Sequence, residues 1–109
     1  QVDWSLPATL IERQIRAFNP WPISFTWIKG NPLRIWQAKI IADEHLKEVA
    51  PGTILAVDQD GIQVATGHDI IQLTHVQREG GHCLPAVELL KGAFAWLKPG
   101  MCFQSIRPS

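Results

Sequence analysis

The chain has 109 residues, of which 46% are hydrophobic, and this is enough for one compact domain with its own core. An intrinsically disordered segment and a chain of several domains are therefore both excluded. A net charge of zero argues against a nucleic-acid binder, because such domains usually carry a basic excess. The charges are uneven, however, with five basic against two acidic residues in 1–41 and two against seven in 42–79. One face of the fold can therefore still be basic.

The opening residues indicate a segment of a longer cytoplasmic protein. The chain begins at Gln1, and QVDWSLPATL has neither the basic head nor the apolar run of a signal peptide. No apolar stretch approaches the roughly 20 residues needed to cross a bilayer. Cys83 and Cys102 lie in unlike contexts with no CxxC motif, which is typical of a reducing cytosol. We expect a monomer in the bacterial cytosol with no membrane partner, and an organelle is the alternative location.

An amphipathic helix is predicted near the N-terminus. Ser5 can cap this helix, with Pro7 in its first turn. The other side carries Glu12 and Arg16, which are spaced for an i, i+4 ion pair, and leaves Arg13 free. The apolar residues that share one side are Leu10, Ile11, Ile15 and Phe18, and the Asn-Pro pair after them ends the helix.

Two hairpins and a fifth strand follow. The segments ISFTWI and LRIWQAKIIA are rich in β-branched and aromatic residues, and they flank the turn sequence KGNP. The segments GTILAVDQ and IQVATG flank Asp60 and Gly61, an Asp-Gly pair that tolerates the positive φ angles of a tight turn. DIIQLTHVQ reads as the fifth strand, with a slip in its alternation at Val76. Between the hairpins, DEHLKEVAPG is charged and predicts a solvated loop.

The last third predicts a second helix and a closing strand. Pro85 can open the helix, and apolar residues continue its spacing as far as Pro99: Val87, Leu90, Phe94 and Leu97. MCFQSI can form a short last strand that closes the sheet. The fold class is therefore mainly β, a small open or closed antiparallel barrel with an N-terminal helix and a late inserted helix, and residues 1–109 form one domain.

The sequence offers little for catalysis or metal binding. Apart from the adjacent His82 and Cys83, no histidine has zinc-ligand spacing to a second ligand. There is no Ser, His and Asp set in a recognisable elbow and no glycine-rich phosphate cradle. We therefore predict no catalytic residue, no metal ligand and no cofactor-binding residue within this chain.

A basic and aromatic surface is the remaining candidate site. Arginine beside aromatic rings on a small barrel is a common way to hold RNA, through phosphate contacts and base stacking. The alternative is that each basic residue is ordinary solubilising surface. Trp21, between two prolines in the loop after the first helix, can stack on RNA, dock on another domain or fold back on the barrel. The predicted nucleic-acid-binding residues of this surface are Arg13, Arg16, Trp21, Lys29, Arg34 and Lys39.

Several stretches together resemble the C-terminal domain of methionyl-tRNA formyltransferase. They are VDWSLPATLIERQIRAFNPWP, LRIWQAKI, APGTILAVDQDGIQVATGHDIIQLTHVQREG and ELLKG, and they cover nearly the whole chain. The most specific are IRAFNPWP and the ordered succession of PGTI, GIQVATG and LTHVQ. After Gly80 the family often has a Gly-Lys-Lys-like run, where this chain has Gly81 and His82. His82 therefore joins the predicted RNA-contacting residues, although this departure favours a barrel that assists another domain over one that grips tRNA by itself.

The resemblance implies a barrel related to the oligonucleotide-binding folds, joined through residues 1–22 to an N-terminal catalytic domain. That domain would move a formyl group from 10-formyltetrahydrofolate to the amino group of methionine on initiator tRNA. The implied partners are the initiator tRNA and the catalytic domain, and the folate would be a substrate of that domain, not a cofactor of this one. Two alternatives stay open: the barrel of a related folate enzyme that does not bind RNA, and a purely structural module at an interdomain seam.

Overall fold

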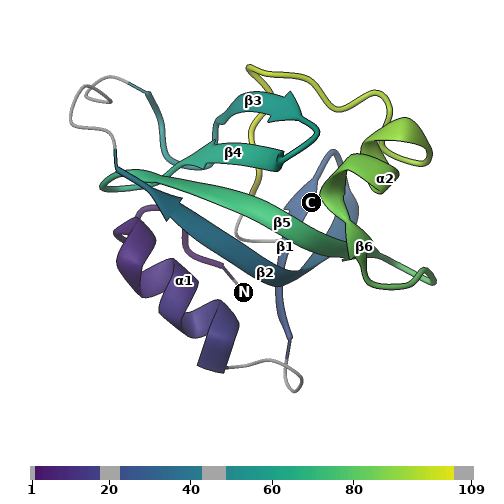
Figure 1. Cartoon of the computed structure of the whole chain (residues 1–109). Coiled ribbons are helices and arrows are strands. Elements are labelled where there is room, and N and C mark those ends of the chain that lie inside the picture. The colour runs from purple at the N-terminus through teal and green to yellow at the C-terminus, as the bar shows by residue number, and fades with distance from the viewer. Residues whose placement is uncertain (1, 18–22, 43–48, 105–109) are drawn as a thin grey trace.

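The structure is a computed structural model that describes residues 2–17, 23–42 and 49–104. An antiparallel sheet with the strand order β1-β2-β5-β4-β3 forms the body of the fold, and β6 pairs with the end of β5. The strongly curved sheet has α1 against β2 on one side and α2 at the far end of β5 (Figure 1). In chain order the elements are α1 (Ala8–Ala17), β1 (Ser24–Ile28), β2 (Asn31–Ile41), β3 (Ile54–Asp58), β4 (Gly61–Ala65), β5 (Ile70–Arg78), β6 (Leu84–Pro85) and α2 (Ala86–Lys91).

Both predicted hairpins are present. Lys29 and Gly30 form the turn between β1 and β2, and their φ angles of 48° and 80° suit the tight turns that match the twist of a hairpin. In the second hairpin Asp58 pairs with Gly61, so the turn lies one residue earlier than the predicted Asp-Gly pair. The predicted slip in the fifth strand is also present, as register shifts between β2 and β5 on either side of Gln37. The mainly β fold class is therefore confirmed.

The segment after α2 closes the sheet into a barrel. The described part of the predicted last strand, residues 101–104, forms two isolated bridges, which join Thr53 to Cys102 and Trp27 to Gln104. Main-chain N–H groups of this segment donate to β1 and to the start of β3, with N···O distances of 2.7 Å from Gln104 to Trp27 and 2.8 Å from Gly100 to Ile54. These bonds pair main-chain groups at both outer strands, β1 and β3, that would otherwise lie at open sheet edges.

The first helix packs its apolar side on the barrel. Ala8, Ile11 and Ile15 are at most 1% exposed, whereas Leu10, predicted for the same side, is 40% exposed. The spacing of the three buried residues places them on one narrow stripe, and Leu10 lies outside it. No helix in the described ranges is long and apolar enough to cross a membrane.

The predicted N-cap at Ser5 is wrong, and the helix begins at Ala8. The Ser5 hydroxyl and main-chain N–H both donate to Asp3 Oδ1, at 2.6 Å and 3.0 Å, whereas the N–H groups of Leu10 and Ile11 in the first turn of the helix donate to the Pro7 oxygen. The hydrogen bond from the Ser5 side chain, and then the one from its main chain, lower the pKa of the Asp3 carboxyl.

The second helix is shorter than predicted. It ends at Lys91, because Gly92 leaves the helical region with φ −121° and ψ −111°. Turns replace the rest of the predicted helix, and they still direct Phe94 and Leu97 into the core, at 5% and 3% exposure. The apolar spacing therefore identified Phe94 and Leu97 correctly, but within α2 the buried residues are Ala86 and Leu89, whereas the predicted Val87 and Leu90 are only partly buried.

A single buried hydroxyl joins three distant parts of the chain. Thr26 on β1 is fully buried, and its Oγ1 accepts a hydrogen bond from Trp4 Nε1 at 3.0 Å. The same hydroxyl donates to the main-chain oxygen of Gln104 at 2.8 Å. The Trp4 ring stacks on Phe103 with 5.5 Å between ring centroids. The first described residues and the closing segment are therefore fixed on β1 together.

We predict that Thr26→Val lowers the free energy of unfolding by about 3 kcal/mol, because the Trp4 N–H and the Gln104 carbonyl both lose a buried partner. Thr26→Ser is the control, since it keeps the hydroxyl and removes one methyl group, at a cost of about 1 kcal/mol. Urea unfolding of both variants measures the difference. Equal destabilisation by the two substitutions would show that the hydroxyl does not hold the two segments on β1.

Gly61 is required by the close approach of two strands. Its φ is 138°, and a Cβ built there would lie 2.2 Å from the main-chain oxygen of Leu73 on β5. Gly80 also has a positive φ, of 76°, but a Cβ there meets no atom within 4 Å. An alanine at position 61 would therefore suffer both backbone strain and a steric clash, whereas an alanine at position 80 would suffer the strain alone.

We predict that Gly61→Ala destabilises the fold by about 3 kcal/mol or more, whereas Gly80→Ala costs about 1 kcal/mol of backbone strain. Only the first substitution forces β4 away from β5. Thermal unfolding of the two variants, with wild type alongside, tests the prediction. Similar melting temperatures for the two alanine variants would contradict it.

Candidate nucleic-acid interface

A cleft of about 330 Å³ lies between α1 and β2. Two of the predicted basic residues, Arg16 from the helix and Lys39 from the strand, meet in it. We call it the α1–β2 cleft. Its lining residues are Glu12, Arg16, Trp36, Gln37, Ala38, Lys39 and Thr74.

The packing of α1 places the charged side of the helix at this cleft. Because Ile11 and Ile15 are buried, the next residue after each, Glu12 and Arg16, emerges at the flank of the helix. Arg16 Nε lies 2.6 Å from Glu12 Oε1, and the arginine side chain is 68% exposed. Glu12 is only 17% exposed, but a guanidinium has five N–H donors, so Arg16 can contact a phosphate without giving up this carboxylate.

Trp36, which is not among the residues predicted from the sequence, forms the aromatic part of the cleft. The residue lies at the register shift of β2, half-buried, and its Nε1 donates to Gln77 Oε1 at 2.9 Å. Gln77 Nε2 in turn donates to the main-chain oxygen of Gly81 at 2.9 Å. The signal was present in the sequence, because Leu33 and Ile35 face the core and the alternation places Trp36 outward.

Arg34 lies on the same outward face, toward the start of β2. Its pairing partners across the sheet are Phe25 on β1 and Gln77 on β5. Together with Phe25, Trp27 and others it lines a separate pocket of about 280 Å³, which we call the outer pocket. Arg34, Trp36 and Lys39 therefore follow one another along β2, although Arg34 does not line the α1–β2 cleft.

The other predicted residues are more scattered. Arg13 is exposed on α1, Lys29 is exposed in the β1–β2 turn, and His82 is exposed between β5 and β6. None of these three lines the α1–β2 cleft or the outer pocket. Trp21 lies outside the described residues, so its predicted role stays a prediction.

The described residues provide no evident catalytic centre. Among them no group of three or more His, Cys, Asp or Glu side chains gathers in a way that could hold a metal ion. Cys83 and Cys102 are both free thiols and both exposed. Burial of part of its surface raises the pKa of the Cys83 thiol, which disfavours the nucleophilic thiolate.

Comparison with known proteins identifies the family. The sequence matches the model of the family described as formyl transferase, C-terminal domain, over residues 1–93. The chain therefore belongs to the formyl transferase C-terminal domain family. This agrees with the family resemblance seen in the sequence at the level of the formyltransferases.

Two solved structures of HypX from Aquifex aeolicus are similar to this chain. One is a variant with several substitutions, with a TM-score of 0.66 and 23% identity, and the match covers 90% of this chain and 17% of that chain. The other is HypX in complex with tetrahydrofolic acid, with a TM-score of 0.67 and 21% identity, covering 98% of this chain and 20% of that chain. At this identity the likeness shows the fold alone, and this chain spans no more than 20% of HypX.

We predict that Glu12→Gln changes the free energy of unfolding by less than about 1 kcal/mol, because the arginine end of the ion pair is 68% exposed and glutamine can still accept its hydrogen bond. Glu88→Gln is the matched control, since Glu88 forms the looser pair with Lys91 at 3.8 Å. Denaturant unfolding of both variants measures the effect. A loss well above that of the control would mean that the Glu12–Arg16 pair holds α1 in place.

Proposed function

We propose that this chain is the accessory C-terminal barrel of a methionyl-tRNA formyltransferase and that its α1–β2 cleft holds the initiator tRNA. The observation that carries the proposal is the meeting of Arg16 and Lys39 beside Trp36 in one cleft. Cationic side chains bind phosphates, and an aromatic ring between them offers a contact for sugar or base. Membership of the formyl transferase C-terminal domain family and the specific stretch IRAFNPWP support the choice of enzyme.

The catalytic groups belong, in this proposal, to a neighbouring N-terminal domain that also binds 10-formyltetrahydrofolate. There the methionyl amino nitrogen attacks the formyl carbon, and the bond from that carbon to the folate nitrogen breaks. The amine loses one proton and the folate nitrogen gains one. The barrel contributes binding energy through RNA far from the reacting atoms. We also propose that the full-length protein is a monomer in the cytoplasm.

The test measures tRNA binding and formylation by the full-length protein with Arg16 and Lys39 both replaced by Ala. Loss of two phosphate contacts flattens the dependence of log binding constant on log salt by about two units. We expect kcat/KM for initiator tRNA to fall while kcat at saturating tRNA stays near wild type, because the lost contacts are made equally in the ground and transition states.

Lys91→Ala is the matched control. Lys91 is a 69% exposed cation on a helix and is paired with a glutamate one turn away, as Arg16 is, but it lies outside the cleft. It should leave both the salt dependence and kcat/KM unchanged. A double variant that behaves like this control would remove the cleft from the RNA-binding surface.

A second candidate function is the C-terminal barrel of a folate-dependent formyltransferase that does not act on RNA. The zero net charge of the chain favours it, and so does the fold-level likeness to HypX, which has been solved with tetrahydrofolic acid. A gel-shift titration of the intact wild-type protein with initiator tRNA separates the two. No shift at low salt supports the second candidate.

A further inference from the structure

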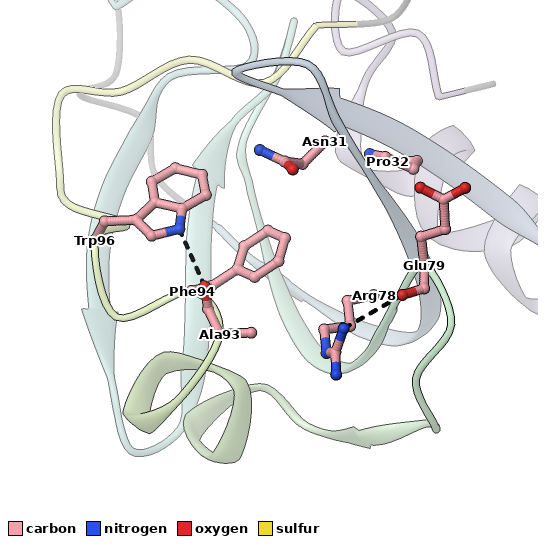
Figure 2. A pocket seen from close by; sticks show the side chains of 7 residues that line it. All are labelled: Asn31, Pro32, Arg78, Glu79, Ala93, Phe94 and Trp96. Carbon is pink, nitrogen blue, oxygen red and sulfur yellow. Dashed lines mark hydrogen bonds between the residues drawn. The ribbon is translucent and has the colours of Figure 1, made fainter.

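A different pocket, which we call the rim pocket, lies at the end of β2 opposite the α1–β2 cleft. It has a volume of about 300 Å³ and opens between the β1–β2 hairpin, the end of β5 and the turn that follows α2 (Figure 2). Strands rise about 3.3 Å per residue, so Pro32 at the rim and Lys39 at the cleft are about 23 Å apart along β2. The rim pocket is therefore a separate site from the cleft.

An aromatic pair forms one wall of the rim pocket. Phe94 and Trp96 are stacked, with 5.1 Å between ring centroids and 27° between ring planes. Phe94 is 5% exposed and so anchors the pair in the core, while the half-buried Trp96 is held by a hydrogen bond from its Nε1 to the Ala93 oxygen at 3.1 Å. A fixed and partly open indole is a surface on which a flat ring can stack at little entropic cost.

The polar groups of the rim pocket are a cation and two acceptors. Arg78 Nη1 donates to the main-chain oxygen of Glu79 at 3.4 Å, and this single bond engages one of the five N–H donors of a guanidinium. Asn31 Nδ2 donates to the main-chain oxygens of Ile28 and Lys29, so its amide oxygen is the part available to a ligand. In Figure 2 the Glu79 carboxylate lies beside Pro32, away from the Arg78 guanidinium. A matching ligand has an anionic group for Arg78 and an amino group for the Asn31 and Glu79 oxygens. It also has a flat ring that can stack on Trp96.

The outer pocket adjoins the rim pocket, and the two share Pro32 and Glu79. Leu33 is the register partner of Arg78, so the pleat directs Arg78 and Arg34 to opposite faces of the rim. The outer pocket repeats the chemistry of the first, with Arg34 beside Phe25 and Trp27, whose rings meet edge to face at 6.1 Å. Two adjoining pockets, each with an aromatic pair and one arginine, suit two linked units better than one free molecule.

We propose that the rim and outer pockets bind two consecutive unpaired nucleotides of the RNA. One base stacks on Trp96 with its phosphate on Arg78, and the next stacks on the Phe25–Trp27 pair with its phosphate on Arg34. The acceptors of the rim pocket select a base with an exocyclic amino group, and cytosine fits because a carboxylate accepts from its N4 amino group. The inference rests on the proposed function, since it assumes that the full-length protein binds RNA.

The test measures binding of single-stranded oligocytidine and oligouridine of about ten nucleotides to the full-length protein by fluorescence anisotropy. Trp96→Leu should weaken oligocytidine binding about 5- to 100-fold by removing the stacking surface. Trp96→Phe keeps an aromatic ring and should retain most of the affinity. Arg78→Ala should flatten the salt dependence by about one unit, and the charge-matched Lys91→Ala should not. Oligocytidine should bind more tightly than oligouridine.

Each of three results would overturn the inference. The first is oligocytidine binding by Trp96→Leu that equals that of Trp96→Phe, in variants whose thermal unfolding is similar. The second is an Arg78→Ala variant with the salt dependence of Lys91→Ala. The third is competition by cytidine monophosphate as strong as that by the dinucleotide CpC, because it would place a free nucleotide in the pocket.

The failure of this inference differs from failure of the proposed function. If Arg16→Ala with Lys39→Ala weakens tRNA binding while the Trp96 and Arg78 variants bind oligocytidine as wild type does, the inference fails and the tRNA-binding cleft stands. If the wild-type protein binds neither tRNA nor oligocytidine, the proposed function fails, and the inference fails with it.

Discussion

The fold depends on the attachment of both flanking segments to β1 through the buried hydroxyl of Thr26. Its two hydrogen bonds span 22 residues to Trp4 and 78 residues to Gln104. A buried polar group that loses its partner costs free energy, so any displacement of either segment that breaks these hydrogen bonds is unfavourable. The Trp4–Phe103 stack covers the joint, and the bridge from Trp27 to Gln104 continues it along β1.

Sequence reasoning succeeded where the determining interactions are local. The KGNP sequence locates the β1–β2 turn, although the turn lies at Lys29 and Gly30 and the predicted Asn31 and Pro32 already belong to β2. The alternation of buried residues identifies which side chains face the core. Sequence reasoning failed where contacts between residues far apart in the sequence determine the backbone. The spacing of Phe94 and Leu97 fits a helix, yet core contacts hold them on turns, and the last segment forms two bridges in place of a strand because it spans the gap between β1 and β3. No local pattern contains that information.

The candidate site was predicted in part, for the same reason. Arg13 and Arg16 are neighbours on one helix, so their exposure follows from the helical period. The meeting of Arg16 with Lys39 depends on how α1 packs on β2, which no local pattern determines. Arg78 was not among the predicted residues, because it lies in the stretch 42–79, which has more acidic than basic residues. Of the aromatic residues beside the arginines, Phe25, Trp27 and Trp36 were assigned to strands and Phe94 and Trp96 to the second helix, and no local pattern brings each of them to its arginine.

The closing segment, Gly100–Gln104, also has a consequence for folding kinetics. It follows β1 and β3 in the sequence, so a chain emerging from the ribosome presents both strands before the residues that pair with them exist. Contacts between residues so far apart in sequence form slowly, because the entropy of closing a long loop must be lost first. During that interval the barrel is an open sheet with two unprotected edges, which can pair with other nascent chains. Folding yield in the cell should therefore depend on how soon the closing segment leaves the ribosome.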